Sequence, residues 1–426
     1  MKMGSINPGR WVAIVSLIAL LSFTAVACGG DDGDSGDSGN NTSQGTTGET
    51  GETGATGDQL TEEDATAGQT SAETANAVSQ SESDSIVAGG RVFADNSPWN
   101  TEVDGLAIDP ESNRMLDLAS ERRGVKEVPG QEGLQTIIRR VNKGLHINTE
   151  AWAPLIVEAG GDGAEVTEFV CRQQKCSSED PAVPDSIAIP PNTTPDPRYD
   201  GWLSVIDAEA GLGYDFWRAR RQTDNTISYQ YAKAWTLDGP GFSQPVSVDP
   251  ERAVGARGSG LPLFAGVIGS EEAAQGRINH ALAIAVPGLA RRNFVQPASV
   301  TDGNGEPDSL PAGARIRLRA NVTADDRDVR VRGARRRSAE SILVALRQYG
   351  AIVVDRAAVP TLYSPRGTSD AVIQGSELSW LTLDDFEVIA LPTLYQDPPL
   401  EQVNQEGTNT TTVEENGSLA NPGGGG

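Results

Sequence analysis

The chain has 426 residues and a formal net charge of −25 at pH 7, but the charge is spread unevenly. Residues 29–85 contribute −13, residues 396–426 contribute −5 and the first 27 residues contribute +2, which leaves −9 on residues 86–395. Since that segment as a whole is mildly acidic and has no basic bias, the composition argues against a nucleic-acid partner. The chain contains only 2 histidines, which excludes a zinc centre made of several histidines.

The first 27 residues have the parts of a secretory signal. Lys2 and Arg10 precede an apolar run that ends in Ala25-Val26-Ala27, and Cys28 follows. This ending resembles the lipobox of bacterial lipoproteins, in which the cysteine becomes the lipidated first residue of the mature chain. We therefore expect cleavage before Cys28, acylation by chains such as palmitate, and an anchor on the extracytoplasmic face of the cell membrane. The alternative is an ordinary signal peptide with an incidental cysteine.

Two segments of low complexity flank the rest of the chain. Residues 28–85 contain the lipidated cysteine and a run of Gly, Ser, Thr, Asp and Glu without Lys or Arg, which predicts a disordered acidic tether. Residues 396–426 end in four glycines and predict a second disordered tail. This organisation leaves residues 86–395 as one globular domain held away from the membrane.

Two cysteines remain for that domain, Cys171 and Cys176. An even pair in an oxidising compartment predicts a disulfide that closes a small loop. A zinc site is the alternative, but it would need further ligands close by.

The pattern of the domain predicts many strands and few helices. The first helix is expected over residues 131–143, where apolar residues recur at helical spacing, and two more over residues 271–275 and after Ser338 as far as Gly350. An antiparallel meander is expected from three aromatic and branched runs at residues 202–207, 214–220 and 227–235. Further strands are expected at residues 155–158, 278–286, 314–322, 352–355 and 386–390. Residues 181–197 are rich in proline and predict a loop.

These elements indicate a mainly β domain, either a β-sandwich or a jelly roll, with a few decorating helices. In the third strand of the meander, alternation places Ile227, Tyr229, Tyr231, Lys233 and Trp235 on one face. The rings of Tyr229, Tyr231 and Trp235, together with Trp217 on the second strand, are the candidate stacking surfaces for sugars. Core packing is the alternative for each of them.

Five residues are candidates for catalysis. His280 could act as a general base, or could be a hydrogen-bonded histidine of a half-buried strand. Asp207, Asp215 and Glu271 could supply the two carboxylates of a glycoside hydrolase, although Asp at a strand end is also a common turn former. His280 or Tyr349 could instead act in a polysaccharide lyase, with an arginine to neutralise the uronate.

Arginines alternate along the strand at residues 314–322. Arg315, Arg317 and Arg319 would share one face, where guanidinium groups could bind the carboxylates of uronic acid polymers. A solvated outer face is the alternative. We expect no cofactor, although Asp325, Asp326 and Asp328 could bind calcium weakly.

Several short motifs together resemble a pattern found in uncharacterised secreted bacterial proteins. The resemblance implies export and a β-rich fold, and no particular activity. The residues that carry it are Ser97-Pro98-Trp99-Asn100, Asp200, Asp207, Gly260-Leu261-Pro262, His280-Ala281-Leu282, Arg315-Ile316-Arg317-Leu318, Tyr349-Gly350 and Asp355.

Three classes of function remain open from the sequence. The domain could be an enzyme of the cell envelope that acts on polysaccharide, a glycan-binding domain without catalysis, or a structural or assembly protein of the envelope. The expected partners are the membrane, through the lipid anchor, and a cell-wall or environmental polysaccharide.

Overall fold

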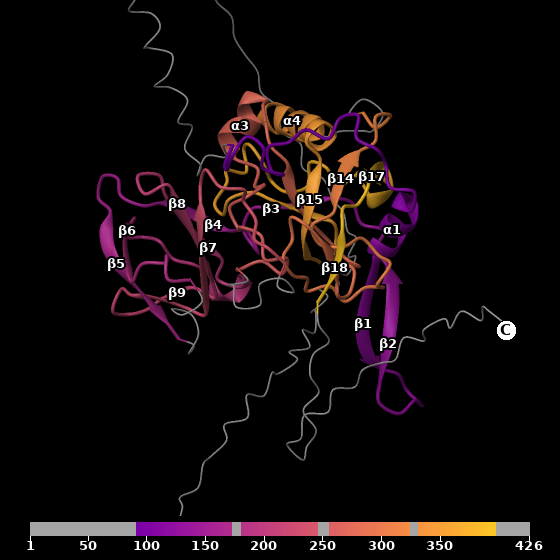
Figure 1. Cartoon of the computed structure of the whole chain (residues 1–426), viewed down its shortest axis with the longest axis horizontal. Coiled ribbons are helices and arrows are strands. Elements are labelled where there is room, and N and C mark those ends of the chain that lie inside the picture. Colours follow the sequence, from indigo (N-terminus) through magenta and orange to yellow (C-terminus); the bar gives the residue numbers. More distant parts are fainter. Residues whose placement is uncertain (1–90, 173–179, 246–254, 324–330, 398–426) are drawn as a thin grey trace, which may run out of the picture. The chain divides into compact units, whose positions relative to one another are not determined.

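The computed structural model describes residues 91–172, 180–245, 255–323 and 331–397 (Figure 1). Contacts divide the chain into Met1–Thr70 and Ser71–Gly426, and all described residues lie in the second unit. The predicted signal, Cys28 and the tether lie outside the described residues, as does almost all of the predicted tail, so these assignments stay predictions. Cys176 and the three aspartates proposed for calcium also lie outside them.

The prediction of a mainly β domain with a few helices is confirmed. The largest sheet has six strands in the order β17-β14-β15-β12-β16-β3. Strands β12 and β15 are parallel, as are β16 and β3, while the other neighbours are antiparallel. The strands of this sheet are β3 (His146–Asn148), β12 (Leu282–Val286), β14 (Arg315–Leu318), β15 (Ala351–Arg356), β16 (Thr361–Tyr363) and β17 (Phe386–Val388).

Two four-stranded sheets pack face to face beside it. The middle sheet has the order β11-β8-β7-β4 and the outer sheet the order β6-β5-β10-β9. Between them lies a core of apolar residues from both sheets, with Phe169 stacked on Phe216 at 4.4 Å between ring centroids. The strands are β4 (Leu155–Glu158), β5 (Glu165–Cys171), β6 (Ser186–Ile189), β7 (Leu203–Asp207), β8 (Leu212–Trp217), β9 (Arg220–Arg221), β10 (Ile227–Tyr229) and β11 (Tyr231–Thr236).

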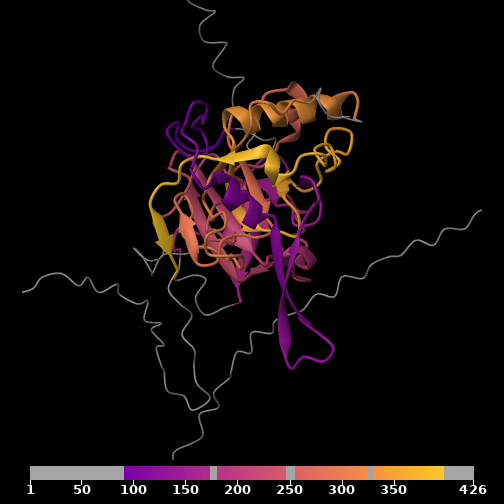
Figure 2. The same ribbon diagram turned by 90° about the vertical axis from the view of Figure 1, so that its right-hand side faces the viewer.

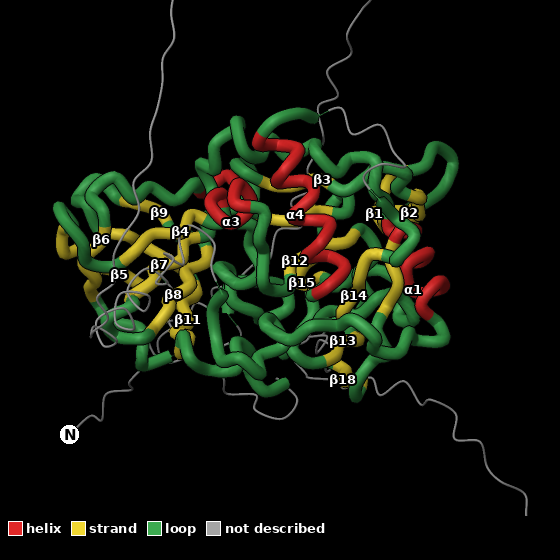
Figure 3. The backbone as a smooth tube through the Cα atoms, turned by 90° about the horizontal axis from the view of Figure 1, so that it is seen from above, coloured by secondary structure: helices red, strands yellow, loops and turns green. Residues whose placement is uncertain are grey.

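Helices cover the opposite face of the six-stranded sheet, as the view from above shows (Figure 3). Helix α4 (Ala334–Gln348) packs against α3 (Ser270–Gln275), while α1 (Ser112–Ala119) lies beside β17. The fold also has two short 3-10 helices, η2 (Pro197–Tyr199) and η3 (Leu383–Asp385). It is completed by two small two-stranded sheets, one of β1 (Glu121–Glu127) with β2 (Leu134–Arg140) and one of β13 (Asn293–Val295) with β18 (Leu394–Gln396).

Strand β12 separates two cores by simple alternation. Leu282, Ile284 and Val286 contact the helix-side core, while Ala283 and Ala285 belong to the core between the six-stranded sheet and the middle sheet. Successive side chains of a strand point to opposite faces, so one run of alternating large and small residues serves both cores. The small alanines face residues 256–267, which run between the two sheets.

Three details of the sequence prediction are wrong. Residues 131–143 form no helix, because Leu134–Arg140 is strand β2 of a hairpin whose loop contains Gly130 and Gly133, both at positive φ. The prolines of residues 181–197 do not prevent strand β6 from forming there. The run 227–235 is broken at Gln230, so Ile227 and Tyr229 join the outer sheet and Trp235 the middle sheet.

Candidate functional site

Asp215 is the most buried of the predicted catalytic residues. It lies on β8 and points into the core between the middle and six-stranded sheets. Its carboxylate accepts hydrogen bonds from Ser204 Oγ (2.5 Å), Trp235 Nε1 (2.9 Å) and Leu263 N (2.7 Å). Burial raises the pKa of Asp215 to about 6, against the lowering effect of these hydrogen bonds. Trp235 is turned inward as a donor to Asp215, so neither side chain is available to a polysaccharide.

Arg257 lies on the far side of Leu263 and forms a second buried group. Its Nη1 binds Asp355 Oδ2 at 2.8 Å and its Nη2 donates to the carbonyl of Leu263 at 2.9 Å. The guanidinium also lies 4.6 Å from the ring centroid of Tyr363. Burial raises the pKa of Asp355 to about 6, although Arg257 acts to lower it. The sequence analysis missed Arg257, although the Gly260-Leu261-Pro262 motif lies three residues after it.

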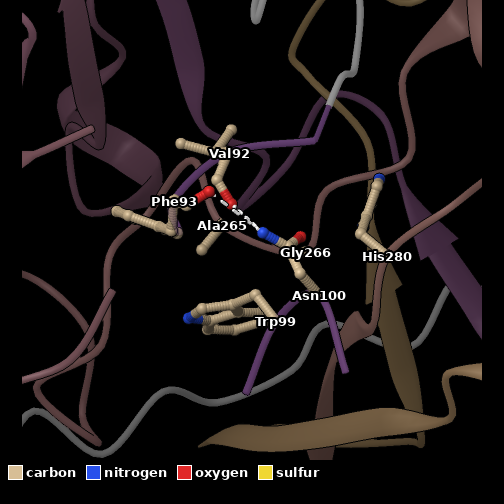
Figure 4. A pocket seen from close by; sticks show the side chains of 7 residues that line it. All are labelled: Val92, Phe93, Trp99, Asn100, Ala265, Gly266 and His280. Carbon is tan, nitrogen blue, oxygen red and sulfur yellow. Dashed lines mark hydrogen bonds between the residues drawn. The ribbon is translucent and has the colours of Figure 1, made fainter. Parts of the chain in front are cut away.

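His280 lines a hollow that is also bounded by residues 92–100 and by Ala265 and Gly266 (Figure 4). Its Nε2 lies 3.1 and 3.2 Å from the two carboxylate oxygens of Glu272, and its Nδ1 lies 3.0 Å from the carbonyl of Ala281. The carbonyl of Ala281 and the carboxylate of Glu272 are both acceptors, so this geometry suits an imidazolium, in which both ring nitrogens donate. Burial would lower the pKa of His280, but the charge of Glu272 and these hydrogen bonds raise it above the usual value.

The hollow is too small for a sugar chain. Its empty volume is about 190 Å³, and this figure includes some open solvent at the mouth of the hollow. Ligand pockets usually have a volume of roughly 300 Å³ or more. Asn100 fixes one wall, because its amide nitrogen donates to the carbonyls of Val92, Phe93 and Ala94. His280 therefore belongs to an ion pair that joins α3 to the start of β12.

The other three predicted catalytic residues lie apart from these groups. Asp207 accepts a hydrogen bond from Ala210 N at 2.9 Å and so closes the turn between β7 and β8. Glu271 is exposed in the first turn of α3, and Tyr349 contacts Glu102 at 3.5 Å. Among the residues that the structure describes, no hydrogen bond or ion pair joins any two of the five side chains.

The arginines of β14 hold the segment that precedes α1. Arg315 donates to the carbonyls of Pro98, Thr101 and Tyr349, the last two at 2.7 Å. Arg317 donates to the carbonyl of Val103 and pairs with Glu387, each at 2.6 Å. These guanidinium groups have partners within the domain, so they do not offer a row of free cations to a uronic acid polymer.

Trp217 and Tyr231 form an aromatic pair at the surface. They are opposite each other in the ladder of β8 and β11, are both half-buried, and have ring centroids 5.6 Å apart. The guanidinium carbon of Arg218 lies 4.4 Å from the centroid of Trp217. Tyr229 does not join them, because it is buried against Phe216 at 5.2 Å.

A second aromatic pair, Trp152 with Tyr199, was missed by the sequence analysis. Trp152 is 49% exposed, has a positive φ of 51°, and its ring centroid lies 5.0 Å from that of Tyr199. The two residues come from separate loops, after β3 and in η2, so no sequence pattern connects them. The only available signal was a tryptophan in a polar loop.

The two pairs are linked by backbone contacts of Asp200, which follows Tyr199. The amide of Arg218 donates to the carbonyl of Asp200 at 2.8 Å. The amide of the next residue, Ala219, donates to the carbonyl of Gly201 at 3.0 Å. We call the resulting series of neighbouring residues the aromatic strip. Its members are Trp152, Tyr199, Asp200, Arg218, Trp217 and Tyr231.

Comparison with known proteins gives no assignment, since the chain matches no family model, no curated protein and no solved structure. Within the described ranges, no three His, Cys, Asp or Glu side chains are grouped so that they could hold a metal ion. No helix in the described part of the chain is long and apolar enough to span a bilayer.

Proposed function

We propose that this domain binds polysaccharide without cleaving it, and that the aromatic strip is its binding surface. The observation that carries the proposal is that the backbone contacts of Asp200 link two aromatic pairs, one containing the exposed Trp152 and the other the half-buried Trp217 and Tyr231. Apolar faces of sugar rings stack on aromatic side chains, and flanking charged groups bind the hydroxyls. The strip contains both kinds of side chain.

The state of the candidate acids and bases favours binding over catalysis. A general acid or base must reach the proton that it transfers. Asp215 is fully buried, and both nitrogens of His280 already have acceptors. A hydrolase would also need two carboxylates on either side of an accessible bond. Asp207 and Asp215 do not meet this need, since one closes a turn and the other lies in a core.

The proposal includes the predicted lipid anchor at Cys28. A lipid on the mature N-terminus, followed by an acidic tether, would present the domain outside the cytoplasm, where wall or environmental glycans are found. Binding to such a polymer would then hold the cell surface against it. Replacing Cys28 by Ala tests this part separately, because the exported protein should then no longer remain with the membrane fraction.

The binding test uses affinity electrophoresis of the full chain in gels that contain individual soluble polysaccharides. We expect retardation by at least one polymer and its loss in Trp152→Ala and Trp217→Ala. Leu106→Ala is a matched control, because Leu106 is 47% exposed and lies outside the strip. Incubation with the same polymer should release no new reducing ends and no unsaturated uronate. Cleavage that persists in both tryptophan variants would contradict the proposal.

A further inference from the structure

In the described part of the chain, hydrogen bonds and ion pairs join the hairpin of β1 and β2 to the rest of the domain at its base and along one flank. Val141 N donates to the carbonyl of Ser120 at 2.7 Å, and Arg140 pairs with Asp117 and with Asp384. Arg123 pairs with Glu306 at 3.0 Å. Figures 1 and 2 both show the rest of the hairpin projecting beyond its neighbours.

No strand of the described ranges pairs with the outer edge of β2. Strand β1 occupies one edge of β2, and the sheet contains no third strand among the described residues. Exposed edges are usually protected by charged side chains, and an isolated two-stranded hairpin is only marginally stable in water. Residues 134–138 are Leu, Gln, Thr, Ile and Ile and carry no charge. The edge therefore lacks the usual protection against pairing with another strand.

One face of the hairpin is also apolar and exposed. Leu134 is 62% exposed, Ile138 46% and Val125 55%. Val125 is opposite Thr136 in the ladder, so its side chain shares a face with those of Leu134 and Ile138. Open backbone groups and an apolar face thus occur on the same projecting element.

We propose that β2 pairs with β2 of a second copy of this chain, which joins two hairpins into one antiparallel four-stranded sheet. A twofold axis at Thr136 puts Leu134 opposite Ile138 of the partner subunit, and Ile138 opposite Leu134 of the partner subunit. The same register puts Glu132 opposite Arg140 of the partner subunit. It brings no like charges together, and it doubles the apolar face.

The other available surfaces fit this role less well. Strand β1 has five charged residues among its seven and contains Gly124, so it is the protected and weaker edge. A membrane surface could accept the apolar side chains but could not satisfy the backbone groups of an open strand. The paired area is small beside the roughly 1,600 Å² of typical stable interfaces, so the dimer should be weak and concentration-dependent.

The first test measures self-association by sedimentation velocity, using the full chain exported with Cys28→Ala so that no lipid is attached. We expect a reversible dimer, and we expect Leu134→Lys to raise its dissociation constant by about tenfold or more. Val166→Lys is the matched control, because Val166 is 77% exposed on β5. A chain that stays monomeric, or a dimer that Leu134→Lys leaves unchanged, overturns the proposal.

The second test examines the register. Thr136→Cys places two thiols next to the twofold axis, so mild oxidation should give a covalent dimer, while Val166→Cys should give none above the level of the chain without the added cysteine. Equal cross-linking of both variants overturns the proposal. So does binding of a monomer to anionic lipid vesicles that Leu134→Lys abolishes.

Discussion

Asp215 and Arg257 bind opposite ends of one residue, since Asp215 accepts from the amide of Leu263 and Arg257 donates to its carbonyl. Asp215 belongs to the middle sheet, and Arg257 pairs with Asp355 on β15 of the six-stranded sheet. Leu263 therefore links two buried charged groups on different sheets. The first three predictions below follow from these groups and from the ion pair at α3.

Removal of Arg257 should destabilise the domain strongly. Arg257→Met leaves the carboxylate of Asp355 buried without its cation, and breaking a buried pair in this way costs about 3–5 kcal/mol. Urea denaturation followed by tryptophan fluorescence measures the loss. Arg336→Ala is the control, because the exposed pair between Arg336 and Glu340 should contribute less than about 0.5 kcal/mol. Equal losses in the two variants would show that the Arg257 group is not a structural ion pair.

The stability contributed by Asp215 should fall as the pH rises. The pKa of Asp215 is raised from 3.8 to about 6 in the folded state. The folded chain therefore binds more protons than the unfolded chain between these values, so the free energy of unfolding decreases with pH there. The native chain should lose up to roughly 1.4 kcal/mol per pH unit relative to Asp215→Asn. A difference that is constant from pH 4 to pH 6 would contradict the raised pKa.

His280 should be an imidazolium at neutral pH. Nitrogen NMR should detect protons on both ring nitrogens, because Glu272 and the carbonyl of Ala281 both accept. Glu272→Gln removes the neighbouring charge and should lower the pKa of His280, whereas Glu271→Gln, at an exposed position, should not. Since the folded pKa is raised, the stabilisation from this pair is present at low pH and is lost as pH rises through the folded value. A neutral ring at pH 6 would refute the assignment.

Sugar affinity should depend on both halves of the aromatic strip. Loss of one stacking ring should weaken binding by roughly tenfold, which corresponds to about 1.4 kcal/mol. Isothermal titration calorimetry, with an oligosaccharide of the polymer that retards the protein in the gel, should show this loss for Trp152→Ala and for Trp217→Ala. Tyr229→Phe is the control within the same sheets, because Tyr229 is buried and outside the strip. An effect of Trp217→Ala alone would restrict the site to the Trp217 and Tyr231 pair.

The sequence predicted local structure well where one principle dominated. Helix α4 has an apolar stripe and ends before Gly350, and strands β4, β7 and β15 have branched apolar runs, so these elements were placed within a few residues. The segment of β2 fitted two periods at once. Its leucine and isoleucines recur at helical spacing, but Thr136, Ile137 and Ile138 favour a strand and the glycine turn before them permits a hairpin.

The candidate site was predictable only in part. Trp217 and Tyr231 were recognised because they lie in one meander, within 14 positions of each other. Trp152 and Tyr199 meet only after two loops fold together, and nothing in their local sequence indicates that contact. Asp215 and His280 had the right chemistry for catalysis, but the sequence could not show that their hydrogen-bonding capacity is used inside the domain.

The dual role of Leu263 also determines where the chain can be divided. A fragment that ended after β11 would keep Asp215 but lose the amide that it accepts from, and a fragment that began at β12 would keep Asp355 without Arg257. In each fragment a carboxylate, Asp215 or Asp355, would lie in an apolar surface without one of its native partners. Independent folding of either half is therefore disfavoured, and the two four-stranded sheets and the helix-covered sheet should unfold together in one transition.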